Sequence, residues 1–525
     1  MATMVAFASS DNHRSHDLLR SYLTIMQQFI FFFFVKYSSY LIVLLVSILI
    51  GFIIRVSISL YNERAINNFM PLTKHKEGSA RELWALSFPL MLTSFSVLTM
   101  VFSDRWLLAH YSTSAHNAAV AATTFAWSFI FGWMSLAGIS EVFVAQYNGA
   151  NLRHKMGEPV WQMIWLSLAS WLFFLPLSCW GTDVFFGSGT ESALERDYFS
   201  IMLLFGPFYV FYASLCGFFV GQGKTALITW VVVFANFFNI FMDWILIFGV
   251  EGWIPSYGVK GAAIATSLAT LFQGVILGAV FLKKKNRLEC GVSLWKPRIK
   301  PMMECIRVGL PSSIFIVTEF LAFGCYYLIM KEKGMAYITV AGVCQGMFIL
   351  FIFFGEGIGK ATMAIAGNMI GAGRSFLIPR VMKAGMVLNL CFLCSVMAFV
   401  ILGSPLIISQ LLPLVDPIFL DEIGPSLQFS LILCVFGLFF ESFRMQFAGI
   451  LTASGDTLFL LTNGAWLVWV FMWLPVYLFI AQGSAPVEAG TFILLCYSLL
   501  ACLVYLWRIK RNQRHGIESI VSSKS

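Results

Sequence analysis

The chain has 525 residues, of which 59% are apolar and only 11% are charged, and its mean hydropathy is +0.82. Soluble domains carry about 25% charged residues, so this composition excludes an ordinary soluble globule. The formal net charge of +8 does not indicate nucleic-acid binding, because the basic residues are spread over short loops. We expect an all-α integral membrane protein, since the apolar runs lack the alternating pattern of barrel strands and lipid leaves no backbone group unpaired.

The chain begins with an extension, residues 1–81, that contains an apolar stretch from Leu23 to Leu60 interrupted by Lys36 and Arg55. The later part of this stretch is about 20 residues long, which is enough to span a membrane once. A signal peptide is less consistent with the pattern, because the run is long and no small-residue cleavage site follows its apolar part. One extra transmembrane helix and a peripheral extension both remain open.

Twelve apolar runs follow, and each is long enough to cross a bilayer. They lie at about 83–110, 118–147, 159–181, 198–220, 226–249, 258–282, 306–331, 337–368, 379–403, 425–452, 458–480 and 486–508. The first six define an N-lobe at 82–282 and the last six a C-lobe at 306–508. A connection at 283–305 joins the lobes, and a tail at 509–525 ends the chain.

Basic residues gather in alternate loops between these runs. They are Arg153, Lys155, Lys283, Lys284, Lys285, Arg287, Lys296, Arg298, Lys300, Arg374, Arg380, Lys383, Arg508, Lys510, Arg511 and Arg514. The opposite loops carry acids instead, among them Asp183, Glu195 and Asp421. By the positive-inside rule, the basic loops, the 283–305 connection and the 509–525 tail are predicted to be cytoplasmic.

Short motifs recur along the chain at a nearly constant separation. LSFPLMLTSF around Pro89 resembles VGLPSSIFIV around Pro311, and YNGAN around Gly149 resembles MIGAG around Gly371, each pair 222 residues apart. The motifs QGKT at 222–225 and SGDT at 454–457 are 232 residues apart, as expected if one loop lengthened. Six spans therefore repeat six spans with the same orientation in the membrane, which predicts a substrate site between the lobes near the midplane.

The sequence contains no sign of an enzyme, a cofactor or a metal site. Gly223-Lys224-Thr225 lacks the glycine that a phosphate-binding loop requires five positions earlier, where Phe218 stands. The histidines show no metal-ligand spacing, and the eleven cysteines lie mostly inside apolar runs, where we assign them to packing.

Ionisable residues inside the predicted spans are the remaining candidates for function, because each costs on the order of 3 kcal/mol at a helix centre. They are Asp104, Glu141, Asp243, Glu319, Glu356, Lys360, Glu441 and Arg444. Asp243 shares one helix face with Asn236 and Asn239, at spacings i, i+3 and i+7. This stripe favours a proton or cation site, and polar contact between helices is the alternative.

The other ionisable residues differ in whether an oppositely charged residue lies close to them in the sequence. Glu356 and Lys360 are four residues apart, which predicts a structural pair within one helix. Glu441 and Arg444 are three apart and could pair in the same way. Glu141 has no sequence-local partner, so a functional role and a position at a wet loop end both stay open.

Seven segments resemble, in order, the motif series of the MATE (multidrug and toxic compound extrusion) family. They are LSFPL, VAQYNGA, GQGKT, NIFMDWILIFG, GVKGAAIATSLA, GLPSSIFIVTE and ASGDT, and the resemblance covers about residues 82–508. It implies two six-helix lobes around a central cavity in a multi-pass protein of the cell membrane. It also implies a secondary active antiporter that exports small organic, often cationic, compounds in exchange for Na⁺ or H⁺, without a cofactor or an obligate protein partner.

The resemblance assigns cation or proton binding to six residues. In the N-lobe these are Asp104, Asn239, Asp243 and Thr266, and in the C-lobe they are Glu319 and Glu441, which match acids of the sodium-coupled bacterial branch. This chain departs from the family pattern at Arg105, which directly follows the first acid, and at Glu356 and Lys360, where uncharged residues are usual. These departures leave the substrate and the coupling ion open.

Two other functions were weighed against export. A lipid or lipid-linked precursor flippase of the same fold superfamily would favour a cavity lined by cations, whereas this chain supplies acids. A membrane enzyme or assembly factor would need a catalytic constellation or a large extramembrane domain, and the sequence indicates neither.

Overall fold

A computed structural model describes residues 72–187, 189, 192–411, 417–516 and 519–520. Within these ranges the chain is helical, and its only extended pairing is an isolated bridge between Val250 and Ile254. Eleven helical segments are long and apolar enough to cross a membrane, and a bent pair of helices makes up to twelve. Each of the twelve predicted spans falls on one of these segments, which confirms the fold class. The apolar stretch Leu23 to Leu60 lies outside the described residues.

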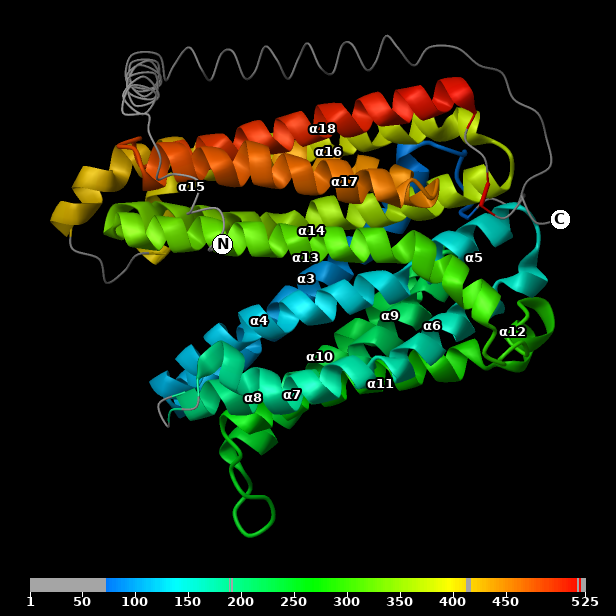
Figure 1. The fold of residues 1–525 in the computed structure, drawn as a ribbon, viewed down its shortest axis with the longest axis horizontal. Coiled ribbons are helices and arrows are strands. Elements are labelled where there is room, and N and C mark those ends of the chain that lie inside the picture. Colours follow the sequence, from blue (N-terminus) through cyan, green and yellow to red (C-terminus); the bar gives the residue numbers. More distant parts are fainter. Residues whose placement is uncertain (1–71, 188, 190–191, 412–416, 517–518, 521–525) are drawn as a thin grey trace, which may run out of the picture.

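The N-lobe is formed by nine helices that make six spans (Figure 1). They are α3 (Ala80–Tyr111), α4 (Thr113–Gly138), α5 (Ser140–Gly149), α6 (Gly157–Ala169), α7 (Trp171–Phe186), α8 (Ala193–Leu204), α9 (Gly206–Val220), α10 (Thr225–Phe248) and α11 (Val259–Phe281). Three spans consist of two helices each: α4 with α5, α6 with α7, and α8 with α9. The last pair bends by 42°, where Pro207 in the first turn of α9 lacks a backbone N–H.

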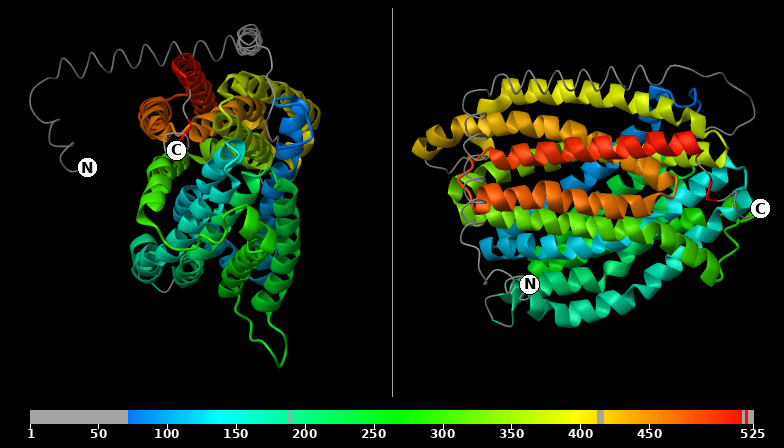
Figure 2. Two further views of the ribbon diagram at one scale, coloured as in Figure 1. Left: turned by 90° about the vertical axis from the view of Figure 1, so that its right-hand side faces the viewer. Right: turned by 45° about the horizontal axis from the view of Figure 1, so that its top comes forward.

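The C-lobe follows a short connecting helix, α12 (Lys284–Glu289). Its helices are α13 (Ile299–Lys333), α14 (Met335–Gly371), α15 (Ile378–Leu411), α16 (Pro417–Ala453), α17 (Thr457–Val468) and α18 (Ala489–His515), and α17 continues through two π-helical stretches to Ala481. The core of this lobe is built around α16, where Phe440, Phe443 and Phe447 are fully buried. Viewed along the bundle, most C-lobe helices lie above those of the N-lobe, and α3 of the N-lobe packs against α14 of the C-lobe (Figure 2, left).

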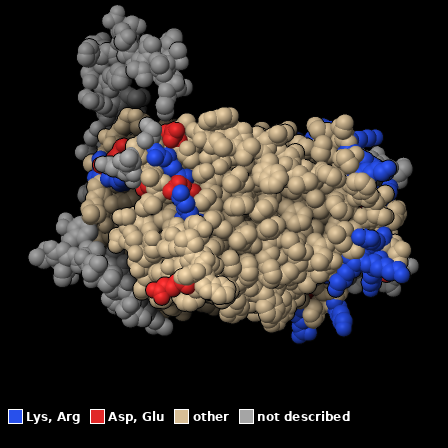
Figure 3. Space-filling model, turned by 90° about the horizontal axis from the view of Figure 1, so that it is seen from below, with Lys and Arg blue, Asp and Glu red and all other residues tan. Residues whose placement is uncertain are grey.

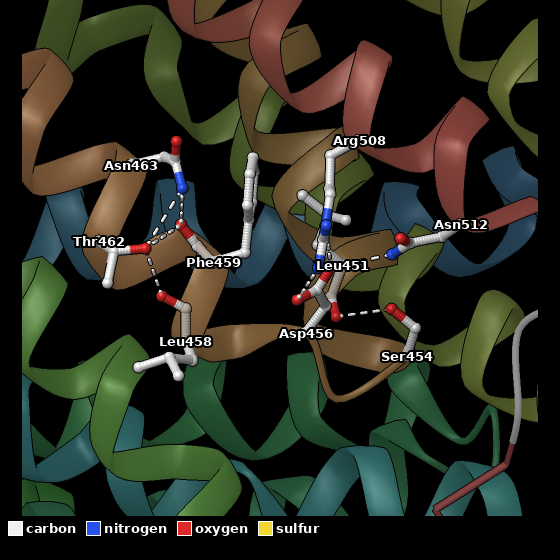
Figure 4. Close-up of polar contacts among 9 residues, drawn as sticks. All are labelled: Leu451, Ser454, Asp456, Leu458, Phe459, Thr462, Asn463, Arg508 and Asn512. Atoms are coloured by element: carbon white, nitrogen blue, oxygen red, sulfur yellow. Dashed lines mark hydrogen bonds and ion pairs between the residues drawn. The ribbon is translucent and has the colours of Figure 1, made fainter.

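The helix ends that carry the predicted basic loops lie at one end of the bundle, which we call the basic end (Figure 1). Lysines and arginines gather at this end on the face drawn in Figure 3. The basic end comprises the lysines and arginines of residues 153–155, 283–300, 374–383 and 508–514. Here Arg508 donates two hydrogen bonds to Asp456 (2.6 and 3.1 Å), and Asn512 donates a third of 2.8 Å (Figure 4). These hydrogen bonds connect the end of α18 to the turn before α17.

The lobes meet at the basic end through the glycines of the sequence repeat. A Cβ atom on Gly149 would overlap the backbone oxygen of Asn368, and one on Gly371 would overlap the backbone oxygen of Gln146. Gly149 of α5 therefore faces Asn368 of α14, the repeat counterpart of Gln146, and Gly371 of α14 faces Gln146 in turn, so the crossing is reciprocal. The Gln146 side chain adds a hydrogen bond of 2.8 Å to the backbone oxygen of Ala453. Away from this end, α4 and α13 diverge (Figure 1).

Candidate functional site

Three helices of the N-lobe bring four predicted site residues together. Asp104 comes from α3, Asn239 and Asp243 from α10, and Thr266 from α11; all four are buried, Asn239 and Asp243 completely. The Thr266 hydroxyl donates to Asp104 Oδ2 at 2.9 Å. Asp104 and Asp243 lie close enough for their carboxylates to interact directly, and Asn239 is next to both. Residues separated by more than 130 positions thus form one polar cluster, which we call the N-lobe acid cluster.

Several atoms of this cluster have no partner in the described part of the protein. They are Asp104 Oδ1, both carboxylate oxygens of Asp243, and both polar atoms of the Asn239 amide. Buried polar atoms are nearly always hydrogen-bonded, and an unpaired buried carboxylate is costly. The cluster is therefore chemically suited to take up a proton or a small cation.

A small cavity adjoins Asp104, with room for roughly one water molecule. Arg105, Thr123, Trp127 and Tyr198 are among the residues that line it. The guanidinium charge of Arg105 acts on Asp104, so the residue that departs from the family pattern contributes to this site. The sequence places Arg105 directly after Asp104 but contains no signal for the cavity that both residues line.

The third residue of the α10 stripe serves a different purpose. Asn236 donates from its side-chain amide to the backbone oxygen of Ser96 on α3, at 2.6 Å. Polar contact between helices, the alternative weighed for the whole stripe, therefore accounts for Asn236. Asn239 and Asp243 belong to the acid cluster instead.

The C-lobe acids lie on either side of an arginine. Arg444 of α16 contacts Glu319 of α13 at 2.9 Å and also pairs with Glu441 of its own helix. Tyr497 of α18 donates a further hydrogen bond of 2.9 Å to Glu319. The side chains of Arg444 and Glu441 are only 6% exposed. The spacing of Glu441 and Arg444 permitted their pairing, but the bridge to Glu319 was not predicted, because nothing local links α13 to α16.

The predicted pair between Glu356 and Lys360 is wrong. Glu356 instead accepts a hydrogen bond of 2.8 Å from Ser94 of α3, so the contact runs between the lobes. Among the described residues, Lys360 makes no ion pair within 4 Å. The charge of Lys360 acts instead on Glu141 of α5, which is 6% exposed and therefore does not face a wet loop end. An i, i+4 spacing permits a pair, but a partner on the opposite lobe was not visible from the sequence.

Metal chemistry finds no support in the described ranges, where no group of three or more His, Cys, Asp or Glu side chains could hold a metal ion.

Comparison with known proteins agrees with this architecture. The MatE family model matches residues 89–245. The chain is 27% identical over 339 residues to the probable multidrug resistance protein NorM of Thermotoga maritima, a match that covers 62% of this chain and 70% of that protein. Its counterpart from Agrobacterium fabrum is 25% identical over 296 residues, with 55% of this chain and 63% of that protein covered.

Solved structures extend the likeness to almost the entire described bundle. A multidrug resistance MATE family transporter of the MOP superfamily, solved in an outward-facing conformation, superposes with a TM-score of 0.73 at 18% identity and covers 83% of this chain and 97% of that one. In sequence and in fold the chain is similar to MATE family transporters. The proteins that it resembles are transporters rather than enzymes, and this chain is a multi-pass protein of the cell membrane.

A second structural neighbour shows that the same MATE-type fold accommodates different polarity. It is a MOP superfamily transporter from Pyrococcus furiosus, described as having a binding pocket of reverse polarity that suggests a different function. Its TM-score is 0.70 at 19% identity, over 86% of this chain and all of that one. The substrate of a MATE fold must therefore be argued from the residues of each chain.

Proposed function

We propose that this protein is a secondary active antiporter that exports organic compounds in exchange for protons. The observation that carries the proposal is the N-lobe acid cluster, in which the buried carboxylates of Asp104 and Asp243 adjoin each other and retain unpartnered oxygens. Two adjacent carboxylates cannot both stay ionised in a low-dielectric site without a compensating charge, and one shared proton removes that conflict.

Arginines in both lobes favour a proton over Na⁺ as the coupling ion. Arg105 lines the cavity beside Asp104, and Arg444 lies between Glu319 and Glu441, where the resemblance implies a cation site. A fixed guanidinium disfavours any added positive charge, but a proton needs only a bond to one carboxylate oxygen, whereas Na⁺ has to gather several oxygen ligands beside the same guanidinium. We therefore assign proton exchange to Asp104, Asn239, Asp243 and Thr266, and we assign to Glu319 and Glu441 the task of holding Arg444.

The orientation in the membrane follows from charge. By the positive-inside rule the basic end, with the 283–305 connection and the tail, faces the cytoplasm. The lobes are in contact at this end through Gly149 and Gly371, so we assign the arrangement to an outward-open state.

The exchange cycle needs only differential binding. In the outward-open state a proton from outside binds the acid cluster, and this occupancy favours rocking of the lobes toward the inward-open state. Substrate then binds from the cytoplasm and the proton leaves, because each ligand stabilises one arrangement more than the other.

Transport of rhodamine B in proteoliposomes, under separately imposed H⁺ and Na⁺ gradients, tests the proposal. We expect uptake against the dye gradient with H⁺ alone, and Asp243→Asn should abolish it and remove the pH dependence of dye binding in detergent. Asp104→Asn should behave in the same way. Transport driven by Na⁺ alone would refute proton coupling. Wild-type rates in both variants would move coupling to Glu319 and Glu441.

A further inference from the structure

Lys360 is a lysine deep within a membrane-spanning helix. It lies eleven residues before the end of α14 at Gly371, or about 16 Å along the helix axis. Its neighbours in the chain, Gly359 and Ala361, are buried, yet the lysine side chain is exposed. A charged residue in a transmembrane segment is expensive and normally faces a partner or a water-filled space.

The surroundings of α14 identify the space that Lys360 faces. Glu356, one turn before the lysine, accepts a hydrogen bond from Ser94 of the N-lobe. Gly367, two turns after the lysine, packs against Ala145 of the N-lobe, and a Cβ on this glycine would lie 3.0 Å from the Ala145 Cβ. Residues 356, 360 and 367 share one helix face, so Lys360 also points toward the N-lobe. An exposed side chain between two contacts with the opposite lobe opens into the space between the lobes.

The turn of α14 that contains Lys360 is packed on its other faces, so lipid does not account for the exposure of this lysine. A Cβ on Gly359 would lie 3.1 Å from the backbone oxygen of Met445 on α16, and one on Gly357 would lie 3.0 Å from that of Ser87 on α3. Both neighbouring helices therefore cover the remaining faces of this turn.

Ionisable groups on the N-lobe side lie within electrostatic reach of Lys360. The Lys360 charge acts on Glu141 of α5 and on Cys216 of α9, and Cys216 in turn interacts with Tyr212 one turn earlier. Cys216 and Tyr212 are partly exposed, as expected if they border the same space. Both lobes thus contribute groups to this interlobe site.

We propose that Lys360 binds a carboxylate of the transported compound and Glu356 its cationic group, so that zwitterionic organic compounds are the favoured substrates. This inference rests on the proposed export function and names the substrate class. Side chains four residues apart on a helix have Cβ atoms about 6 Å apart, which suits a compound whose opposite charges are separated by a few ångströms. Glu141 provides the opposing charge for Lys360 when no substrate is bound.

The charges of the three ionisable side chains at this site favour a zwitterion over a simple anion or cation. Lys360, Glu356 and Glu141 together carry one positive and two negative charges, so a simple organic anion would be repelled. A simple cation would be attracted to the acids but would leave the exposed ammonium unpaired. A zwitterion pairs with both signs and leaves the net charge of the site unchanged.

The test compares rhodamine B, which carries a cationic ring system and a carboxylate, with rhodamine B ethyl ester, which differs only by esterification of that carboxylate. Dissociation constants come from fluorescence polarisation with purified protein in detergent, so they do not depend on ion coupling. We expect Lys360→Met to weaken binding of rhodamine B about tenfold and to tighten binding of the cationic ester, and Lys360→Arg to restore the wild-type order.

Controls separate this inference from the export mechanism. Lys260→Met removes a lysine that pairs with Asp197 at 3.2 Å outside the interlobe site, and it should change neither affinity. Asp243→Asn should lose proton-driven transport but retain the wild-type preference between the dyes. Equal weakening of both dyes by Lys360→Met, or no change in either, would overturn the zwitterion site. If transport by the wild-type protein does not depend on the proton gradient, while the dye affinities change as expected, the coupling mechanism is wrong and the zwitterion site stands.

Discussion

Removal of Arg444 should destabilise the protein more than any other single loss of charge in the C-lobe. The Arg444 side chain is 6% exposed, and its guanidinium contacts Glu319 at 2.9 Å and Glu441 directly. The guanidinium carbon lies 5.9 Å from the centre of the Phe315 ring. Arg444→Met keeps most of the apolar volume but leaves the buried carboxylate of Glu441 and the partly buried one of Glu319 without a counter-charge. Breaking a buried ion pair by removal of one partner costs about 3–5 kcal/mol.

The assay is thermal stability of the detergent-solubilised protein, followed by fluorescence-detected size exclusion after heating. Arg508→Met is the matched control, because Arg508 also pairs with a carboxylate, Asp456, at 2.6 Å, but with a side chain that is 26% exposed. Partly exposed pairs contribute about 0–1 kcal/mol, so the control should lower the melting temperature much less.

A compensating variant identifies the cause of the loss. In the triple variant Glu319→Gln, Glu441→Gln and Arg444→Met the uncompensated charges are absent, and stability should return most of the way to the wild-type value. If Arg444→Met melts at the wild-type temperature, or if the triple variant is as unstable as the single one, buried charge is not the reason and the assigned role of Glu319 and Glu441 fails.

Two further predictions test orientation and rocking. Ser293→Cys, in the exposed 283–305 connection, should react with an impermeant maleimide only after cells are permeabilised, whereas Glu251→Cys at the opposite end should react in intact cells; the reverse pattern would invert the topology. Gly371→Val should reduce proton-driven transport of rhodamine B at least tenfold, equivalent to about 1.4 kcal/mol. The valine side chain would overlap the backbone of Gln146 and keep the lobes from closing at this end. Gly346→Val on the same helix, where a Cβ meets no atom within 4 Å, is the control, and an equal effect in both variants would show that the crossing is not limiting.

The spans and the repeat could be predicted from the sequence because both are local properties. Hydropathy located all twelve runs, and the 222-residue separation anticipated that Gly149 and Gly371 are equivalent. The breaks inside spans were not predicted. Ile139 and Ser170 interrupt helices within continuous apolar sequence, and only Pro207, beside the bend between α8 and α9, provides a local signal.

The polar contacts were predictable only where one helix contains both partners or the family resemblance supplies the match. The spacing of Asn239 and Asp243 indicated a shared face, and the resemblance added Asp104 and Thr266. For Glu356 the same spacing argument failed, since its partner Ser94 is 262 residues away on the other lobe. Helical periodicity gives the direction of a side chain but not the helix that it meets.

The two lobes share a fold but differ in how their buried acids are compensated, and this difference bears on the proposed cycle. In the C-lobe, Arg444 contacts acids from two helices and is held in place by both, so the charge state of that cluster stays fixed while the lobes move. In the N-lobe, no cationic side chain among the described residues pairs with Asp243, and its oxygens lack partners. Only the N-lobe cluster then gains stability from an incoming proton. In the proposed cycle, the unequal acid clusters would make the motion of the lobes respond to protons in the N-lobe alone.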